Sequence, residues 1–261
     1  GKSVMQVVRL PFRKGGKIDL DFLEKELARG GVGLVSVMHV NNETGIVNDL
    51  EKIGKLCKTY KTMFHTDAVQ SFGKLKVDVR KMNVDLLSGS GHKLGGLKGC
   101  GFLYVRTGLR MKLWVYGGGQ ERGLRSGTEN VQGIVSLGVA LEEVRKVNWT
   151  KTQRIRARLV DGLVDLGGKV NPGDFPEILS VSFPGVSGED LVVFLSEQGI
   201  LVSTGSACAS RRQKESKTLR ALGLNKKERD GNLRFSFGDD LEMKDVERVA
   251  GEVGKALKIL R

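Results

Sequence analysis

The stretch "VDLLSGSGHKLGG", residues 84–96, joins an apolar run to a single lysine among small residues. The apolar part is typical of a buried strand, and the glycine and serine residues after it are typical of a tight turn. Small residues on both sides of Lys93 leave room for another group to approach the backbone closely. Open α/β sheets bind ligands beyond the carboxyl ends of their strands, so Lys93 is a candidate functional residue.

Outward from this stretch, apolar runs alternate with longer amphipathic segments, which predicts an α/β layered fold. The expected strands are residues 33–40, 62–67, 84–90, 99–106, 178–183, 200–203 and 232–238. The expected helices are residues 49–61, 130–147, 152–168, 188–198, 214–223 and 243–260. We place a domain boundary near Leu141, which predicts a domain over 1–141 and a smaller one over 142–261.

The composition excludes several classes of protein. The formal charge of the 261 residues is 43 − 30 = +13, but basic and acidic residues are interleaved, which argues against nucleic-acid binding as the main function. The three cysteines show neither CxxC spacing nor a disulfide framework, which indicates a reducing compartment and no structural metal. No apolar run reaches the roughly 18 residues of a membrane span. We therefore expect a protein of the cytoplasm or of an organelle matrix, although a targeting segment could precede Gly1.

Four polar clusters follow expected strands: residues 39–45, 65–71, 88–93 and 203–210. Lys93 could form a Schiff base with a carbonyl group, and Asp67 could pair with a protonated ring nitrogen. Lysine and aspartate together are the pair by which proteins hold pyridoxal phosphate. The residues alone also allow a solvated surface lysine and a helix-capping Asp67.

Seven segments in order carry a resemblance to a known family: "MHVNNETG", "HTDAVQSFGK", "SGSGHK", "GGGQERGLRSGTEN", "STGSACAS", "LRALGL" and "LRFSFG". Together they resemble cysteine desulfurases of the NifS/IscS type, which are pyridoxal 5'-phosphate enzymes of the class V aminotransferase family. The resemblance implies an α/β fold, the aspartate-aminotransferase-like fold type I of pyridoxal-phosphate enzymes. It further implies a large domain with a mixed sheet and a smaller C-terminal α/β domain that carries a cysteine loop.

The resemblance assigns cofactor roles to five residues. Lys93 would bind the cofactor covalently, Asp67 would pair with the pyridine nitrogen, and Gln70 would donate to the phenolic oxygen. Ser90 and His92 would bind the cofactor phosphate. Lys93 and His92, with Cys208, are the expected catalytic residues.

Further roles concern the substrate and a second subunit. Asn42 would contact the bound amino acid and the ring hydroxyl, and Arg234 would bind the substrate carboxylate through its planar fork. Thr128 would reach the cofactor phosphate of the neighbouring subunit, which implies a homodimer. The implied substrate is L-cysteine, whose sulfur would pass to Cys208 as a persulfide and leave alanine.

Each of the three cysteines can also be explained as a buried core residue without a chemical role. Gly205, Ser206 and Ala207 leave the approach to Cys208 uncrowded, and nearby basic residues favour its thiolate, but a buried small hydrophobe would also explain this residue. Cys57 and Cys100 lie in apolar contexts and are predicted to be core residues. No role is assigned to His39 or His65.

The resemblance leaves several alternatives open. The family normally carries a further stretch before the point where this sequence begins, so we expect an incomplete large domain and a separate or missing N-terminal polypeptide. A selenocysteine lyase, another class V relative, or a non-catalytic subunit that docks an acidic partner would share most of the motifs. The sulfur acceptor, a scaffold for iron-sulfur assembly or a thiolation partner, is not identified by the sequence.

Overall fold

The structure, a computed structural model, describes residues 6–112, 114–205 and 216–261. The chain packs into two compact units. We call Glu24–His39 with Asn48–Val147 the four-stranded unit, and Gly1–Leu23, Val40–Val47 and Asn148–Arg261 together the three-stranded unit. The units interleave along the sequence, because residues 40–47 pack with the C-terminal part of the chain. As a division into functional domains, the boundary near Leu141 stays a prediction.

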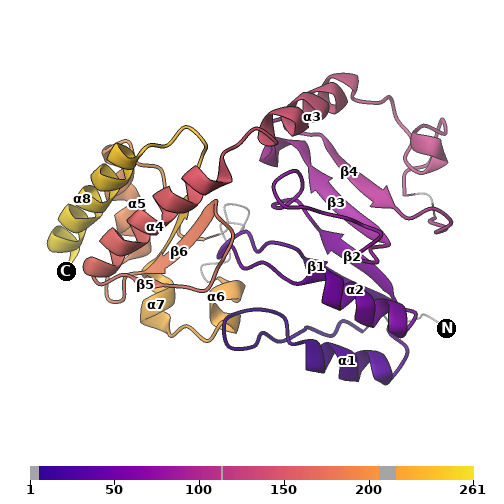
Figure 1. Cartoon of the computed structure of the whole chain (residues 1–261), viewed down its shortest axis with the longest axis horizontal. Helices are drawn as coiled ribbons and strands as arrows, with labels where there is room; N and C mark the ends of the chain where they lie inside the picture. The colour runs from indigo at the N-terminus through magenta and orange to yellow at the C-terminus, as the bar shows by residue number, and fades with distance from the viewer. Residues whose placement is uncertain (1–5, 113, 206–215) are drawn as a thin grey trace. The chain divides into compact units, whose positions relative to one another are not determined.

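The four-stranded unit contains a mixed sheet whose strands follow one another in chain order, as Figure 1 shows. Its strands are β1 (Leu34–Met38), β2 (Met63–Asp67), β3 (Leu86–Ser90) and β4 (Gly101–Val105). The first three strands are parallel, and β4 is antiparallel to β3. The parallel strands therefore bring their carboxyl ends to one edge of the sheet. This arrangement confirms the predicted mixed sheet.

The two faces of this sheet differ in burial. Val35, Val37 and Phe64 are buried, and helix α2 (Leu50–Thr59) packs against β2 with Ile53 and Cys57 also buried. Alternate residues on the opposite face are more exposed: Leu34, Met63 and Leu103 keep 47%, 40% and 46% of their surface. Asp67 follows Met63 at an even spacing and therefore lies on this more exposed face.

The remaining elements of the four-stranded unit are short turns and one long helix. The 3-10 turns are η1 (Gly91–Lys93) and η2 (Glu121–Gly123), and helix α3 spans Val131–Val144. Asn130 caps α3, since its side-chain oxygen accepts a hydrogen bond from Gly133 N at 3.0 Å. Helix α3 packs against η1. Helix α1 (Leu20–Ala28) spans the boundary between the two units.

The three-stranded unit is built on an antiparallel sheet of order β5 (Lys169–Val170), β6 (Ile178–Ser182) and β7 (Asn232–Ser236). Its helices are α4 (Trp149–Asp165), α5 (Gly188–Glu197), α6 (Lys217–Ala221), α7 (Lys226–Asp230) and α8 (Met243–Leu260). Helices α4 and α5 both pack against α8. The buried residues of α4 recur at helical spacing, which explains why one face of the helix enters the core.

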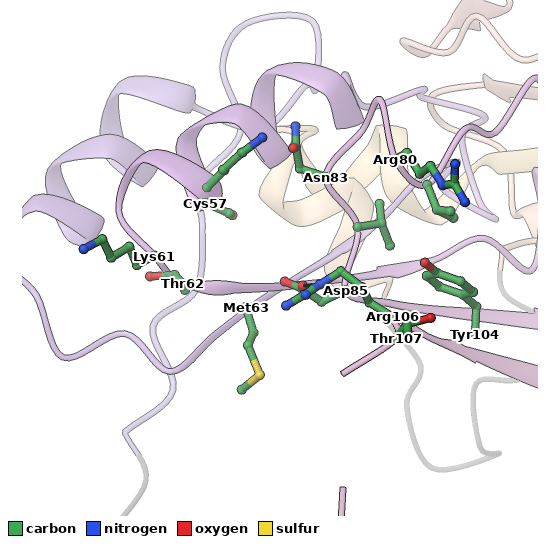
Figure 2. Close-up of a pocket in the computed structure, with 13 residues that line it drawn as sticks. Cys57, Lys61, Thr62, Met63, Arg80, Asn83, Asp85, Tyr104, Arg106 and Thr107 are labelled. Atoms are coloured by element: carbon green, nitrogen blue, oxygen red, sulfur yellow. Dashed lines mark hydrogen bonds and ion pairs between the residues drawn. The ribbon is translucent and has the colours of Figure 1, made fainter. Parts of the chain in front are cut away.

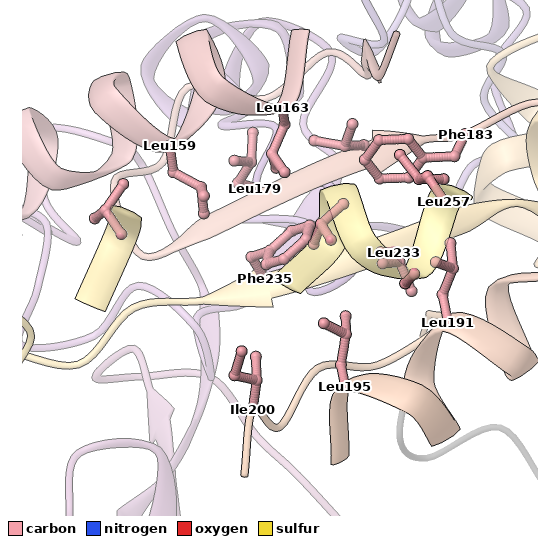
Figure 3. Packing of buried hydrophobic residues seen from close by; sticks show 14 of the residues in the cluster. Leu159, Leu163, Leu179, Phe183, Leu191, Leu195, Ile200, Leu233, Phe235 and Leu257 are labelled. Carbon is pink, nitrogen blue, oxygen red and sulfur yellow. The ribbon is translucent and has the colours of Figure 1, made fainter. Parts of the chain in front are cut away.

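Both faces of β6 are buried. Leu179, Phe183 and Phe235 point into the apolar core together with leucines of α4, α5 and α8, as Figure 3 shows. The other face carries a buried polar network of Asn171, Ser180, Ser182 and Asn232. In this network the amide of Asn171 donates to Ser180 Oγ at 3.0 Å, and the amide of Asn232 donates to the same oxygen at 2.9 Å. The network satisfies polar groups that would be costly to bury alone.

Four local features differ from the predictions. The strand expected at residues 200–203 is wrong, because only Ser203 pairs there, in an isolated bridge with Arg234. Helix α1, helix α7 and the two-residue strand β5 are not predicted. Helix α7 has the polar sequence KKERD and contains no buried residue, so it carries no apolar periodicity; a capping box between Asn225 and Glu228 defines its start instead.

Candidate functional site

Asp67 lies at the carboxyl edge of the four-stranded sheet. It is the last residue of β2 and stands opposite Met38 on one side and Ser88 on the other. Its Oδ1 accepts a hydrogen bond from Val69 N at 2.9 Å, which orients the carboxyl group over the following turn. Ser88 opens the segment that leads to Lys93, so the two predicted cofactor segments meet at adjacent strand ends.

Ser90, His92 and Lys93 lie within a single tight turn after β3. Ser90 Oγ and His92 Nδ1 are hydrogen-bonded at 2.8 Å. Turn η1 is closed by the hydrogen bond from Leu94 N to Gly91 O at 2.9 Å. Ser90 and Lys93 are half-buried, whereas His92 is exposed. A hydroxyl, an imidazole and an amine are therefore grouped at the end of β3.

The glycines around this turn allow side chains of the same unit to pack closely against the backbone. A Cβ atom at Gly89 would lie 2.2 Å from the ring of Phe102, and one at Gly91 would lie 3.1 Å from Leu137. The Phe102 ring also contacts Phe72, with 4.6 Å between ring centroids. The close approach that the small residues predicted is thus made at Gly89 by an aromatic side chain of the neighbouring strand.

Gln70 is buried in the turn that follows β2. This turn is fixed to β3 because Ala68 N donates to Ser88 O at 2.9 Å, and it closes on itself because Ser71 N donates to Ala68 O at 3.0 Å. Asp67 and Gln70 are thus held by the same turn, three residues apart.

His65 connects three strands on the face that carries Asp67. Its Nδ1 is hydrogen-bonded to Ser36 Oγ at 2.8 Å, and its Nε2 to Ser88 Oγ at 2.9 Å. Burial lowers the pKa of His65, and the nearby Asp67 carboxyl group opposes this effect. The sequence leaves His65 unassigned because its partners come from other strands; the polar residues His65 and Asp67 at alternate positions of β2 are the signal that points to it.

His39 follows β1 and is almost fully buried. Its Nδ1 is hydrogen-bonded to Ser71 Oγ at 2.8 Å. Burial lowers the pKa of His39 to about 4, so the imidazole is neutral at physiological pH. His39 is therefore a neutral group that is hydrogen-bonded to Ser71, the residue after Gln70.

The other predicted site residues lie elsewhere. Asn42 and Arg234 belong to the three-stranded unit, where Arg234 Nη1 donates to the Asn42 carbonyl oxygen at 2.9 Å. Thr128 is exposed in the loop before α3. Cys208 lies outside the described residues. The structure thus groups Asp67, Gln70, Ser90, His92 and Lys93 in one unit, and Asn42 with Arg234 in the other.

A cavity of about 880 Å³ lies at the end of the four-stranded sheet where β2 begins and β4 ends, and Figure 2 shows residues that line it. Asp85 lies at its centre: Oδ2 accepts from Phe64 N at 2.8 Å, and Oδ1 accepts from Arg106 Nε at 2.5 Å. Burial raises the pKa of the adjacent Cys57 thiol to about 12, and this confirms the prediction of a core cysteine. None of the predicted site residues that the structure describes lines this cavity, and the Asp85 carboxyl group is already bonded to Phe64 N and Arg106.

Two observations concern metals and membranes. Within residues 6–112, 114–205 and 216–261, no three His, Cys, Asp or Glu side chains gather as ligands for a metal ion. No helix in the same ranges combines the length and the apolar character that a bilayer crossing requires.

The residues at the edge of the four-stranded sheet fit a small anionic ring compound. Asp67 offers a carboxyl group for a cationic ring atom, and Lys93 offers an amine for a carbonyl carbon. The hydrogen-bonded pair of Ser90 and His92 offers donors for a phosphate group. These groups come from two adjacent strand ends, and together they provide the donor set that such a compound needs.

Comparison with known proteins identifies relatives over nearly the whole chain. The family model described as aminotransferase class-V matches residues 2–249. The protein named cysteine desulfurase IscS from Vibrio vulnificus (strain CMCP6) is 41% identical over 266 residues, which cover 98% of this chain and 65% of the relative. The chain therefore spans slightly less than two thirds of the length of this curated relative.

Solved structures give the same result. A structure described as a NifS-like protein matches with a TM-score of 0.87 and 35% identity, covering 98% of this chain and 69% of the other. A structure described as SspA in complex with cysteine matches with a TM-score of 0.76 and 35% identity, covering 88% of this chain and 65% of the other. Fold and sequence therefore agree on one family.

Proposed function

Because the chain belongs to the aminotransferase class-V family, we propose that it is a cysteine desulfurase that uses pyridoxal 5'-phosphate to remove sulfur from L-cysteine. The observation that carries this proposal is the pairing of Asp67 with Ser88 across β2 and β3. This pairing brings the carboxyl group of one segment to the same sheet edge as the turn of Ser90, His92 and Lys93. A likeness to a protein solved with cysteine supports the choice of substrate.

Pyridoxal phosphate, when bound, supplies an electron sink that weakens bonds to the α- and β-carbons of an amino acid. The residues of this chain would hold it at fixed points. Asp67 would hold the charge of the ring nitrogen, since a carboxylate beside the ring keeps that nitrogen protonated. Gln70 would donate to the ring oxygen, and Ser90 with His92 would bind the phosphate. Lys93 would hold the aldehyde carbon and move protons at its Nζ atom.

The substrate would be held by the three-stranded unit. Arg234 offers a planar guanidinium that can bind a carboxylate with two parallel hydrogen bonds. Its Nη1 already donates to Asn42 O, so the guanidinium is oriented in part by the protein. The side chain of Asn42 would contact the amino acid. These assignments rest on the resemblance of "HVNNETG" and "LRFSFG" to the family.

Cys208 is the proposed sulfur acceptor. Its thiolate would attack the sulfur of L-cysteine, forming an S–S bond while the Cβ–S bond of the substrate breaks. Cysteine and a protein thiol thereby become alanine and a protein persulfide. The electrons and atoms balance without an added oxidant, because the electron pair of the broken bond takes up a proton at carbon. The persulfide would pass to an acceptor or scaffold protein for iron-sulfur assembly or for thiolation.

We further propose a homodimer in which Thr128 contacts the cofactor phosphate of the partner. The exposure of Thr128 in the loop before α3 is consistent with such a contact. A cytoplasmic or organelle-matrix location, in a reducing compartment, agrees with the use of a free cysteine as nucleophile.

The cofactor assignment is tested by reducing the protein with borohydride in the presence of pyridoxal phosphate and mapping the modified peptide by mass spectrometry. We expect covalent label on Lys93 in the unmodified protein. We expect no label at this position in Lys93→Ala, and normal label in Lys98→Ala, which removes an exposed lysine of the same loop. Label distributed equally over surface lysines, or none at all, contradicts the proposal and favours a non-catalytic binding subunit.

The sulfur-transfer step is tested separately. Cys208→Ala is expected to abolish persulfide formation from L-cysteine while leaving the label on Lys93 intact. Continued formation of sulfide at the original rate would overturn the assignment of Cys208. Activity confined to selenocysteine would favour a selenocysteine lyase.

A further inference from the structure

Glu43 lies in the turn after β1, and its carboxyl group is bound from a distant part of the chain. Ser216 Oγ donates to Glu43 Oε2 at 2.5 Å, and Thr218 Oγ1 donates to Glu43 Oε1 at 3.0 Å. The donors are more than 170 residues away in sequence, and all three side chains are half-buried within the three-stranded unit. Both oxygens of one carboxyl group are therefore used to hold the start of α6.

The backbone of Glu43 is itself held firmly. Asn41 Oδ1 accepts hydrogen bonds from Glu43 N at 2.9 Å and from Thr44 N at 3.0 Å. Gly45 has a φ of +79°, and a Cβ atom at this position would lie 3.0 Å from Ile178 O, so the turn packs directly on β6. The position of this turn, and of the Glu43 backbone, is therefore set by its contact with the sheet of the three-stranded unit.

Glu43 is hydrogen-bonded to residues that directly follow the segment 206–215 and lies near the residue that precedes it. Ser216 and Thr218 follow this segment directly, and Ser216 also caps α6 by accepting from Leu219 N at 3.1 Å. Gly205 precedes it, and a Cβ atom at Gly205 would lie 3.5 Å from Glu43 Oε2. The two described residues that flank the segment thus lie next to the same oxygen atom.

The turn of Glu43 also reaches Arg234. Arg234 Nη1 donates to the carbonyl oxygen of Asn42, the residue before Glu43, at 2.9 Å. The backbone of Arg234 is paired with Ser203 through N–O distances of 2.6 and 3.2 Å. One short turn therefore connects the proposed carboxylate-binding arginine with the start of α6, directly after the segment 206–215.

We propose that Glu43 is a positioning residue: its carboxyl group fixes the start of α6, the flank that follows the segment 206–215, and lies near Gly205 and Arg234. The inference rests on the proposed function, because Cys208 belongs to that segment and Arg234 is the proposed ligand of the substrate carboxylate. Hydrogen bonds from hydroxyl groups to a carboxylate are strong, and a half-buried site protects them from competing water. Loss of the carboxyl group would release two hydroxyl donors at the start of α6.

Limited digestion with trypsin tests the positioning role without cofactor or substrate. The segment contains three cleavage sites, Arg211, Arg212 and Lys214. In Glu43→Ala we expect the rate of cleavage at these sites to rise at least roughly tenfold, because local opening no longer has to break charge-assisted hydrogen bonds. Cleavage elsewhere is expected to be unchanged. Glu189→Ala, which removes an exposed glutamate of α5 in the same unit, is the matched control.

Two further variants separate the carboxyl contacts from a general loss of folding. Glu43→Gln keeps one acceptor oxygen, so its cleavage rate is expected between those of the original protein and Glu43→Ala. Thr218→Val removes one donor and keeps the shape, and adding Glu43→Ala to it is expected to have a less than additive effect. Equal cleavage rates in all variants, or additive effects, would overturn the proposal.

The consequence for sulfur transfer is measured in a single turnover with L-cysteine. Glu43→Ala is expected to slow persulfide formation on Cys208 at least roughly tenfold, while borohydride labelling of Lys93 stays at the original level. Persulfide formation at the original rate, despite faster cleavage by trypsin, would contradict the positioning role. If the original protein forms neither label nor persulfide, the proposed function has failed, and the trypsin comparison still decides whether Glu43 anchors the start of α6.

Discussion

His39 shows how a single side chain can make stability depend on pH. The ring is 5% exposed and bonded to Ser71, and burial lowers its pKa from 6.5 to about 4. The unfolded chain therefore binds a proton between these two pH values that the folded chain does not bind. By linkage, the stability from neutral His39 is fully present above pH 6.5 and is lost as the pH falls towards 4.

We expect the free energy of unfolding to fall by up to roughly 3 kcal/mol over this interval because of His39. His39→Gln, which keeps a polar side chain but cannot take up the proton, should flatten the dependence. Urea unfolding at a series of pH values measures the effect, and His92→Gln, at an exposed histidine, is the control. An unchanged slope in His39→Gln would show that other groups carry the acid sensitivity.

The grouping of candidate site residues was predictable from sequence only where those residues lie in one short segment. The segment "SGSGHK" points to Ser90, His92 and Lys93, and the structure places all three in one turn. His65 and Glu43 also lie in quoted motifs, but the sequence does not reveal their contacts, because their partners lie 29 and more than 170 residues away. Side-chain networks across strands depend on register, which the sequence of one strand does not specify.

Helix α2 illustrates a constraint at the scale of an element. Gly54 lies within this helix, where alanine is normally more stable than glycine by about 1 kcal/mol. A Cβ atom at Gly54, however, would lie 1.8 Å from the carbonyl oxygen of Met82. The glycine lets the loop before β3 pass directly over the helix.

Gly54→Ala is expected to destabilise the protein by about 1–3 kcal/mol, since the backbone of the loop must move away. Gly138→Ala, in helix α3 where nothing lies within 4 Å of the new methyl group, should be neutral or stabilising by up to about 1 kcal/mol. Thermal unfolding of both variants measures the difference. A similar change in both would mean that helix propensity, and not the contact with Met82, decides the result.

Elements with a strong apolar period were predicted at nearly their observed positions. Helix α8 is expected at 243–260 and observed at Met243–Leu260, because its buried residues recur at helical spacing. The short run at 200–203 is apolar but makes only one bridge, since Leu201 is 85% exposed. An apolar run of four residues does not reveal whether a neighbouring strand is available.

At the scale of the whole molecule, one surface is unusually apolar. Helix α3 exposes a stripe at helical spacing that we call the α3 patch: Val131, Ile134, Val135 and Val139. Apolar residues gathered in this way indicate an interaction surface. The patch lies on the helix that directly follows the loop of Thr128, which agrees with the proposed homodimer.

Val135→Lys is therefore expected to weaken self-association by at least roughly tenfold, because a charge would be buried in an apolar contact. Val193→Lys is the matched control, since both valines are on helices and are 60% and 57% exposed. Sedimentation velocity over a range of concentrations measures the dimer fraction. If both variants dissociate equally, or if the original protein is already a monomer, the α3 patch has no role in self-association.

The grouping of segments into units was beyond prediction from sequence alone. Residues 40–47 pack with the three-stranded unit although they follow β1 directly. Their packing depends on contacts such as the one from Val47 N to Asp174 Oδ1 at 2.9 Å, across 127 residues. The pattern of apolar and amphipathic segments along the chain shows where one kind of pattern gives way to another, but not which distant segments share a core.

The buried network of asparagine and serine beneath β6 has a consequence for how the molecule should respond to acid. None of its four members, Asn171, Ser180, Ser182 and Asn232, gains or loses a proton as the medium becomes more acidic. Near pH 4, therefore, the protonation state of this network does not change, whereas the imidazole of His39 in the four-stranded unit takes up a proton. Acidification should accordingly weaken the surroundings of His39 in the four-stranded unit while this network keeps its hydrogen bonds.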